Sequence, residues 1–345
     1  MLRDAKTIAV VMMLVATIHV ARAGEVGQAS IPFPKGQEAK HLLFSKGITC
    51  TSDHYYTEYV NSKWLPGGKL CVRDLEAGKS VDLVPELKNG VFGRFDLDFD
   101  ACKVVFAFKA EPAEGYRIYE IDVDSQTGRR TGTELRQLTF PAANEKDLYT
   151  NYKRGTDDMH PAYLPDGLIV FVSTRIQYGI LCNGQDKLTT TVLYSMDGNG
   201  KNMRPLTNSS VSEASPTLLE DGRILYMRWE YVDKGGSAVK CLWAMNQDGS
   251  VSCEVYRNNI DYPTTFIFGR PIPGRPSEYV VLGAPHTPST LGTVIRLDMT
   301  KNIRTREPMT YMTPDIDFRS GPHAPAGWPE VLLYWPACPC STGVV

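Results

Sequence analysis

Asp157, Asp158 and His160 are the residues of this sequence whose types and spacing most readily suggest chemistry. They lie within four positions of one another, and oxygen and nitrogen donors of these types could hold a divalent metal ion. A structural role is the alternative, because Ser215-Pro216 takes the place of His160-Pro161 in a related stretch of sequence. Such a pair can simply cap the start of a strand. The equivalence of His160-Pro161 and Ser215-Pro216 favours the structural role, and the metal site is the second hypothesis.

A second set of carboxylates alternates along the chain at Asp96, Asp98 and Asp100. Residues two apart in a strand lie on the same face, so these side chains could share a structural calcium ion. The glycine and the closing glutamate of a calcium-binding loop are missing from this stretch. We therefore expect a solvated strand face or a turn here, with structural calcium as the alternative.

The motifs of several familiar catalytic centres are missing from the sequence. It has no G-x-S-x-G nucleophile motif and no pair of histidines at helical spacing. Its eight cysteines form neither a C-x-x-C-H haem-attachment motif nor a zinc-type C-x-x-C pair. They could form disulfides or be buried as small apolar residues, and the sequence leaves both open. We expect this chain to have no catalytic residues and no cofactor of its own.

The first residues have the pattern of a secretory leader. Arg3 and Lys6 precede an apolar run from Ile8 to Val20, and a small-x-small cleavage site follows at Ala21-Arg22-Ala23. A run of roughly 13 apolar residues is shorter than the ~20 that span a bilayer. We therefore predict an exported protein with no membrane span, a signal peptide at residues 1–23 and an N-terminal extension at residues 24–40.

The charge balance argues against a nucleic-acid partner. The formal net charge is −2, and charged residues make up 22% of the chain. Proteins that bind nucleic acid present a strongly basic surface instead. The elements that would position a binding site must therefore be sought in the repeats of the chain.

A repeat is visible in the middle of the chain. The stretch from His160 to Arg175, followed by Leu193 to Gly200, recurs as Ser215 to Trp229, followed by Leu242 to Gly249. Each copy has an Asp-Gly turn and then alternating apolar residues, which is typical of a β-hairpin. A repeat of about 50 residues built from short strands is typical of a propeller blade.

Weaker copies extend the repeat in both directions, at Phe95 to Phe106 and at Glu278 to Asp298. We predict an all-β protein in which residues 41–345 form a single β-propeller of six to seven four-stranded blades, similar to TolB and WD40 repeats. A last blade begins at Trp328 to Trp335. Either it is incomplete, or the strand around His41 to Ser45 closes it.

Two polar stretches between strands are longer than a hairpin requires. They run from Arg175 to Thr189 and from Trp229 to Ala238. Loops on a rigid scaffold often carry binding residues, although variable surface loops are the alternative. The candidates for partner contact are Cys182, Asn183, Gln185 and Asp186 in the first loop, and Glu230, Tyr231, Asp233 and Lys234 in the second.

The blade strings Asp158-Met-His-Pro-Ala-Tyr-Leu-Pro-Asp-Gly-Leu-Ile-Val-Phe-Val-Ser-Thr-Arg175 and Asp221-Gly-Arg-Ile-Leu-Tyr-Met-Arg-Trp-Glu-Tyr-Val-Asp-Lys234 closely resemble the propeller of the hydrazine synthase family of anammox bacteria. The resemblance extends over most of the chain, from about His41 to Trp335. Because the chain has no haem motif, it resembles the haem-free β-propeller (beta) subunit of that family.

The resemblance implies a place in a complex that makes hydrazine from nitric oxide and ammonium. The partners would be the haem-bearing alpha and gamma subunits, which hold the c-type haem, and the location would be the anammoxosome lumen. This chain would hold the subunits in register and shape the passage between their haem sites. Two alternatives are a periplasmic TolB-like propeller that binds proteins and a stand-alone propeller enzyme such as a polysaccharide lyase or a hydrolase.

Overall fold

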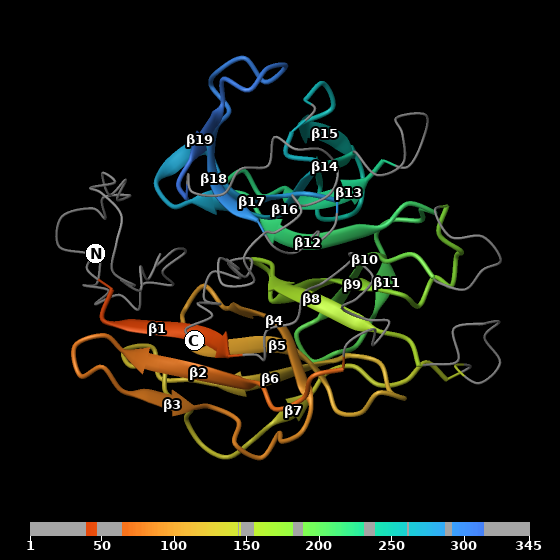
Figure 1. The fold of residues 1–345 in the computed structure, drawn as a ribbon. Helices are drawn as coiled ribbons and strands as arrows, with labels where there is room; N and C mark the ends of the chain where they lie inside the picture. Colours follow the sequence, from red (N-terminus) through yellow and green to blue (C-terminus); the bar gives the residue numbers. More distant parts are fainter. Residues whose placement is uncertain are drawn as a thin grey trace.

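The protein is a β-propeller, in which small antiparallel sheets are arranged as blades around an axis (Figure 1). A computed structural model describes residues 39–46, 64–143, 145, 155–181, 189–230, 239–260, 262–286 and 292–313. In these ranges all the regular elements are strands. None of the described residues forms a helix that is long and apolar enough to cross a membrane.

The first sheet has three strands, paired in the order β1-β2-β3. They are β1 (His41–Lys46), β2 (Lys69–Asp74) and β3 (Ser80–Asp82). β1 pairs with β2 along its whole length. The predicted contact between β1 and the last blade cannot be followed, because residues 328–335 lie outside the described ranges.

The next two sheets each have the four strands predicted for a blade, and these strands are paired in sequence order. The first consists of β4 (Val91–Leu97), β5 (Lys103–Lys109), β6 (Arg117–Asp122) and β7 (Arg136–Gln137). The second consists of β8 (Asp158–Tyr163), β9 (Leu168–Ser173), β10 (Val192–Asp197) and β11 (Arg204–Pro205).

The last two blades share one continuous sheet. The first of them has β12 (Glu213–Leu218), β13 (Ile224–Trp229), β14 (Lys240–Met245) and β15 (Cys253–Tyr256). The second has β16 (Thr265–Ile272), β17 (Arg275–Ala284), β18 (Thr293–Asp298) and β19 (Met309–Tyr311). A parallel pairing of Lys240 with Thr265 joins β14 to β16. The described residues thus form five blades, and the prediction of six or seven also counts sequence outside them.

The Asp-Gly turns form where the sequence predicts them, between the first and second strands of a blade. Gly167 and Gly222 have φ angles of 72° and 85°, in the left-handed region that glycine adopts without steric cost. The strands that follow are apolar on both faces, and Ile169, Val170 and Phe171 are fully buried. Both faces are covered because each blade packs between its neighbours.

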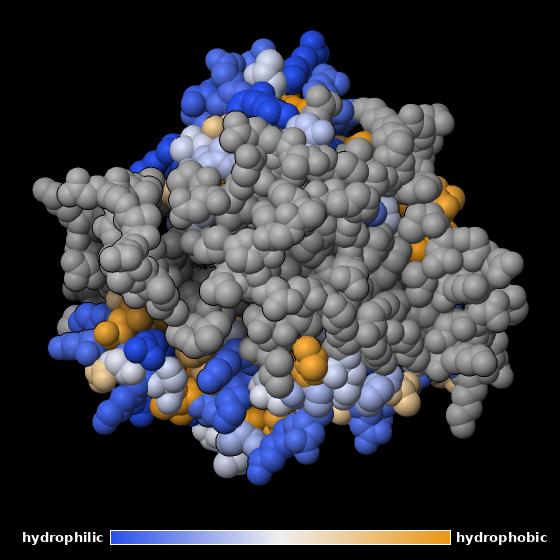
Figure 2. Space-filling model, in the orientation of Figure 1, coloured by the Kyte–Doolittle hydropathy of each residue, from blue (hydrophilic) through white to orange (hydrophobic). Residues whose placement is uncertain are grey.

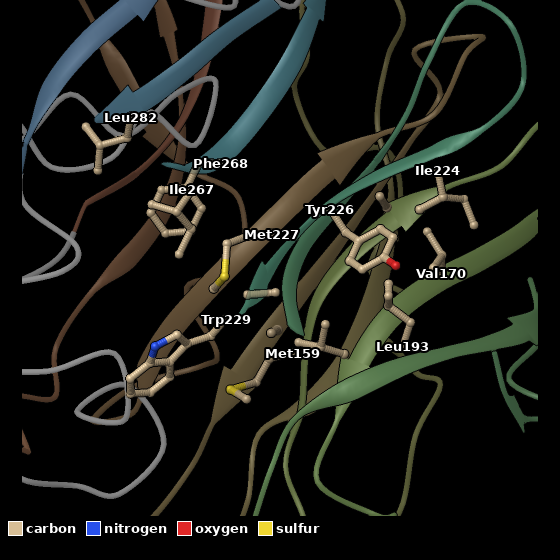
Figure 3. Packing of buried hydrophobic residues seen from close by; sticks show 14 of the residues in the cluster. Met159, Val170, Leu193, Ile224, Tyr226, Met227, Trp229, Ile267, Phe268 and Leu282 are labelled. Atoms are coloured by element: carbon tan, nitrogen blue, oxygen red, sulfur yellow. The ribbon is translucent and has the colours of Figure 1, made fainter. Parts of the chain in front are cut away.

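The largest apolar cluster joins several blades. Figure 3 shows side chains from different blades meeting there, among them Met159 of β8, Met227 of β13 and Phe268 of β16. Burial of such side chains contributes about 1.5–3 kcal/mol each. Packing between blades, rather than within one blade, therefore holds the inner strands in place.

A threonine at the end of each of three blades fixes the outer strand. The hydroxyl oxygens of Thr139, Thr207 and Thr313 each accept a hydrogen bond of 2.9 Å from a third-strand N–H group. The donors are Ile118, Leu193 and Val294. Thr139 and Thr207 each follow a leucine and Thr313 follows a methionine, and the three threonines have the same structural function.

The strand order separates two kinds of connection. Short turns link first to second strands, and the stretches from β9 to β10 and from β13 to β14 both link second to third strands. Antiparallel pairing places these two longer connections at the same end of their blades.

In Figure 2 the described surface at the β16–β19 end is mostly hydrophilic, and hydrophobic residues are scattered in small groups.

Candidate functional site

Asp158 lies at the start of β8 and is fully buried. Arg175 holds its carboxylate in a bidentate contact, with Nε 2.8 Å from Oδ1 and Nη2 2.6 Å from Oδ2. The Ser173 hydroxyl donates to Oδ1 at 2.8 Å, and Arg117 Nη1 lies 3.9 Å from Oδ2. The carboxylate is therefore occupied by two guanidinium groups and a hydroxyl.

Asp157 has different partners, from the preceding blade. Its Oδ1 accepts a hydrogen bond of 2.9 Å from the N–H of Tyr116 and lies 3.7 Å from Lys109 Nζ. The ammonium of Lys109 also lies over the Tyr116 ring, 5.5 Å from its centroid. Both Asp157 and Lys109 are almost completely buried. The two aspartates thus connect the β4–β7 blade with the β8–β11 blade through charged contacts.

Glu145 extends this network between the two blades. Its Oε1 lies 3.3 Å from Arg117 Nη2 and accepts hydrogen bonds of 2.6 Å from both the backbone N–H and the hydroxyl of Thr156. The carbonyl of Thr156 in turn accepts a hydrogen bond from Arg117 Nη1. We call Lys109, Arg117, Glu145, Asp157, Asp158 and Arg175 the interblade ion network.

His160 does not join the two aspartates in this network. Its Nδ1 accepts a hydrogen bond of 3.2 Å from the N–H of Ser215, and its ring meets Phe268 edge-on with centroids 6.2 Å apart. Among the described residues, no three His, Cys, Asp or Glu side chains form a group that could hold a metal ion. The metal site of Asp157, Asp158 and His160 stays an untested prediction, and the geometry gives each residue a protein partner.

The equivalence of His160-Pro161 and Ser215-Pro216 is confirmed by the pairing registers. Each pair lies in a β-bulge of an inner strand, between Met159 and Ala162 in β8 and between Ala214 and Thr217 in β12. The inner strands β4 and β16 have bulges at the corresponding place. His160, Ser215 and Phe268 occupy this position with φ angles of 51°, 58° and 63°. Backbone strain of this kind is found at sites that the surrounding structure holds firmly.

Two of the three alternating aspartates serve separate structural purposes. Asp96 Oδ2 accepts a hydrogen bond of 2.9 Å from the N–H of Tyr163, and its Oδ1 lies 3.3 Å from Arg270 Nη1. Asp98 Oδ1 accepts from the N–H groups of Cys102 and Lys103, at 2.7 and 2.9 Å. This geometry favours the turn over structural calcium, which stays an untested alternative.

Arg270 connects inner strands that are distant in sequence. It extends from β16 to Asp96 of β4, and its Nη1 donates to the Thr217 hydroxyl of β12 at 2.7 Å. Asp96 in turn accepts from Tyr163 of β8. Burial raises the pKa of Asp96, although the attraction of Arg270 lowers it. The guanidinium therefore ties three blades together, and Asp96 links them to a fourth.

Glu213, at the start of β12, is a buried carboxyl group with an unusual pKa. Burial raises its pKa to about 7, and a hydrogen bond from the Thr207 hydroxyl and the attraction of Arg228 oppose this rise. Its Oε2 also accepts a hydrogen bond of 3.3 Å from the N–H of Leu193. Glu213 therefore changes charge near neutral pH.

We expect the stability of the protein to fall as the pH rises through this range. The pKa of Glu213 is raised above the ordinary value of 4.5 for a glutamate, so the cost of burying its charge is absent below pH 4.5 and complete above pH 7. A pKa rise of this size corresponds to a loss of about 3 kcal/mol in the free energy of unfolding. The Glu213→Gln variant should lack this loss when the free energy of unfolding is measured in urea between pH 5 and 8.

Glu278→Gln is the matched control. A hydrogen bond from Arg296 lowers the pKa of Glu278, so the stability it contributes is present at neutral pH and is lost as the pH falls. The Glu278→Gln substitution should change the pH dependence of the free energy of unfolding only on the acid side. If Glu213→Gln left this pH dependence unchanged, Glu213 would not be the group responsible for the loss.

A buried lysine lies between the last two blades. Lys240 Nζ is 3.0 Å from His286 Nδ1 and 3.3 Å from the Thr265 hydroxyl, and it lies 4.6 Å from the centroid of the Trp229 ring. Lys240 and Trp229 are almost completely buried. These contacts reinforce the parallel pairing of β14 with β16.

Most of the predicted partner-contact residues cannot be placed. Cys182, Asn183, Gln185, Asp186, Tyr231, Asp233 and Lys234 lie outside the described residues. Glu230 is described and follows β13. Its Oε1 lies 3.1 Å from Arg228 Nε, and its N–H donates to the carbonyl of Val239 at 2.8 Å. It is thus anchored at the base of the connection to β14.

The cations of these networks were not predicted from the sequence. Lys109, Arg117 and Arg175 lie at or near strand ends, and Arg270 lies within an apolar strand. A charged residue inside or directly after an apolar strand run is the signal that could have indicated them. Such residues are seldom buried without a partner of opposite charge.

The comparisons with known proteins identify the architecture. No model of a known protein family and no curated protein matches the sequence. A solved structure of a hydrazine synthase from Kuenenia stuttgartiensis is similar, with a TM-score of 0.61 and 16% sequence identity. The match covers 81% of this chain and 40% of that chain. The likeness shows a shared propeller fold.

Two TolB structures are more distant. TolB from Acinetobacter baumannii has a TM-score of 0.48 and 12% identity, with 79% of this chain and 52% of that chain covered. A putative TolB from Agrobacterium tumefaciens has a TM-score of 0.48 and 14% identity, with coverages of 79% and 88%. The chain thus spans less than two thirds of the length of the hydrazine synthase chain and of the first TolB chain.

Proposed function

We propose that this chain is the haem-free propeller subunit of a complex of the hydrazine synthase type. The structural likeness to a hydrazine synthase, with a TM-score of 0.61, is the observation that carries the proposal. The sequence contains no haem-attachment motif, so the c-type haem and the catalytic centre would belong to the alpha and gamma subunits. The chain would take part in an oxidoreductase without carrying its chemistry.

The geometry favours a scaffold for this role. The charged side chains of the interblade ion network bind one another across blades, and Arg270 ties inner strands across the axis. A propeller held in this way presents its loops on a rigid support. The two long connections leave the same end of their blades, so their residues could contact one partner surface and shape the passage between its haem sites.

The proposal includes the location of the protein. The leader-like first residues suggest export, and a hydrazine synthase complex would place the chain in the anammoxosome lumen. A TolB-like protein-binding module in the periplasm is the alternative.

The test is purification of the tagged full chain from its native source, with an optical spectrum and mass identification of the proteins that accompany it. We expect haem absorbance from co-purified multihaem subunits. A colourless chain with envelope proteins or peptides would overturn the proposal in favour of the TolB-like module.

Loop variants make the test specific to the proposed contact surface. Combined alanine substitutions of Asn183, Gln185 and Asp186 should reduce the haem protein recovered with the tag. Asp248→Asn, in the turn between β14 and β15 at the other end of its blade, is the matched control and should leave recovery unchanged. Equal recovery with both variants would show that these loop residues do not hold the partner.

A further inference from the structure

We propose that Arg228 is a pH-dependent switch, which pairs with Glu230 while Glu213 holds its proton and moves to Glu213 when that proton is lost. Glu213 begins β12, Arg228 lies near the end of β13, and Glu230 directly follows β13. The switch would link the pH of the solution to the base of the connection from β13 to β14. It is a property of this chain alone and goes beyond the assembly role proposed above.

The three charged side chains lie on one face of the β12–β15 blade. The pairing register of β12 with β13 places Glu213 directly opposite Arg228, and such cross-strand neighbours can interact through their side chains. Glu230 comes two residues after Arg228, and residues two apart along a strand point to the same side. One guanidinium is therefore placed between two carboxylates, and its single charge can balance only one of them.

In the structure the guanidinium lies beside Glu230. Arg228 Nε is 3.1 Å from Glu230 Oε1, but this buried nitrogen makes no hydrogen bond with any described residue. The contact at this atom depends on charge without an aligned hydrogen bond, and such a contact is weaker than a charge-assisted hydrogen bond. The Cζ atom of Arg228 also lies 4.6 Å from the centroid of the Trp243 ring, in a cation–π contact that needs no hydrogen bond.

Glu213 gains more from the arginine than Glu230 does, once Glu213 is charged. Glu213 is 1% exposed, whereas the side chain of Glu230 is 24% exposed. Opposite charges attract more strongly in a buried environment of low dielectric constant. Water can also solvate the partly exposed carboxylate after the guanidinium has moved. The charged form of Glu213 should therefore draw Arg228 away from Glu230.

The pKa of Glu213 places this change near neutral pH. Burial raises it to about 7, the attraction of Arg228 opposes the rise, and the repulsion of Glu230 adds to it. Below this pH the buried carboxyl group is neutral, and Arg228 has one charged carboxylate to pair with. Above this pH it has two, and the buried one is favoured.

The other groups that face Glu213 and Arg228 are uncharged in this range. The Thr207 hydroxyl and the N–H of Leu193 donate hydrogen bonds to Glu213 Oε2. Burial raises the pKa of Tyr226 in β13 and that of Cys241, which is paired with Arg228 from β14, to about 12 each. The phenol and the thiol therefore keep their protons at pH 8.

Two further charged side chains lie toward the outer strand of the blade. Glu254 of β15 accepts hydrogen bonds of 2.7 and 2.8 Å from the N–H and the side-chain amide of Asn258. Arg257 Nε donates to the carbonyl of Pro263 at 2.8 Å. Both charges act on Cys241, and neither is among the main influences on the pKa of Glu213.

Double-mutant cycles on the full chain test the switch. The unfolding equilibrium constant is measured in urea at about pH 5.5 and pH 8 for the natural sequence, Arg228→Met, Glu230→Gln and the double variant. The cycle gives the coupling between the two residues. We expect a coupling of about threefold to fivefold at the lower pH, in the range of partly exposed ion pairs, and none at pH 8. Equal coupling at both pH values, or none at the lower pH, would overturn the proposal.

The same cycle in the Glu213→Gln background identifies the group that drives the change. Glutamine has the shape of glutamate and no charge, so the coupling between Arg228 and Glu230 should persist at pH 8. If it still disappeared there, Glu213 would not control Arg228 and the proposal would fail.

The Arg296–Glu278 pair is the matched control. Its Nε and Oε2 atoms are 2.6 Å apart, and its side chains are 30% and 18% exposed. A hydrogen bond from Arg296 lowers the pKa of Glu278, so this carboxylate stays charged over the whole range. The coupling should be the same at both pH values. A parallel loss in this pair would show a general effect of pH and overturn the switch.

A spectroscopic measurement leaves the three charged residues unchanged. The chain is labelled with 5-fluorotryptophan, and the fluorine signal that is missing in Trp243→Phe belongs to Trp243. Because the guanidinium lies over this ring, its signal should shift with a midpoint near pH 7, and the shift should be absent in Glu213→Gln. A Trp243 signal that stays constant between about pH 5.5 and pH 8 in the natural sequence would overturn the proposal.

Discussion

The Asp158→Ala variant should lose about 3–5 kcal/mol of its free energy of unfolding. The carboxylate is fully buried and holds Arg175 in a bidentate contact. Removing one partner of a buried ion pair leaves the other charge without compensation, and losses of this size are typical. Urea denaturation followed by tryptophan fluorescence measures the change.

Asp122→Ala is the matched control for this prediction. Asp122 also contacts an arginine through both oxygens, with Arg136 nitrogens at 2.8 and 2.7 Å, but its side chain is 40% exposed. Exposed ion pairs contribute only about 0–1 kcal/mol. Similar losses in Asp158→Ala and Asp122→Ala would show that burial does not give the interblade ion network its strength.

The Arg270→Met variant should be destabilised by a similar amount, about 3–5 kcal/mol at neutral pH. Methionine keeps much of the apolar volume, but it cannot pair with Asp96 or donate to Thr217. Without the guanidinium, the pKa of the buried Asp96 should rise further. The cost of its charge then grows as the pH rises above the pKa of an unfolded aspartate, so the loss should be larger at pH 8 than at pH 5.

The matched control is Arg275→Met, which removes an arginine of the next strand whose contact with Glu278 is long, at 3.5 Å, and partly exposed. It should change the free energy of unfolding by less than about 1 kcal/mol. In the double variant Asp96→Asn/Arg270→Met, the extra loss at pH 8 should disappear. If Arg270→Met showed no such pH dependence, Asp96 would not be the group that Arg270 stabilises.

The sequence predicts the blades well because their signals are local. The Asp-Gly turns and the alternating apolar residues each involve residues close together in the chain. The equivalence of His160-Pro161 and Ser215-Pro216 was also visible in the repeat, and the structure confirms it. The sequence did not indicate that these residues form a bulge with left-handed backbone in the inner strands.

The charged contacts could not be predicted in the same way. Asp96 and Arg270 are distant in sequence and meet only because the blades curve around a common axis. The partners of Asp157 and Asp158 come from the preceding blade and from Arg175, which follows β9 in the same blade as the two aspartates. A pair of neighbouring carboxylates looks the same in sequence whether a metal ion or a set of arginines binds it.

The parallel pairing of β14 with β16 has a consequence for sequence divergence. The backbone N–H of Lys240 donates to the carbonyl of Thr264, so part of the boundary between the last two blades consists of main-chain atoms. Any residue except proline can supply that donor. The boundary between the β4–β7 and β8–β11 blades depends instead on particular charged side chains. This main-chain contact should therefore persist through substitutions in related proteins, whereas at the second boundary a changed residue would require a compensating change in its partner.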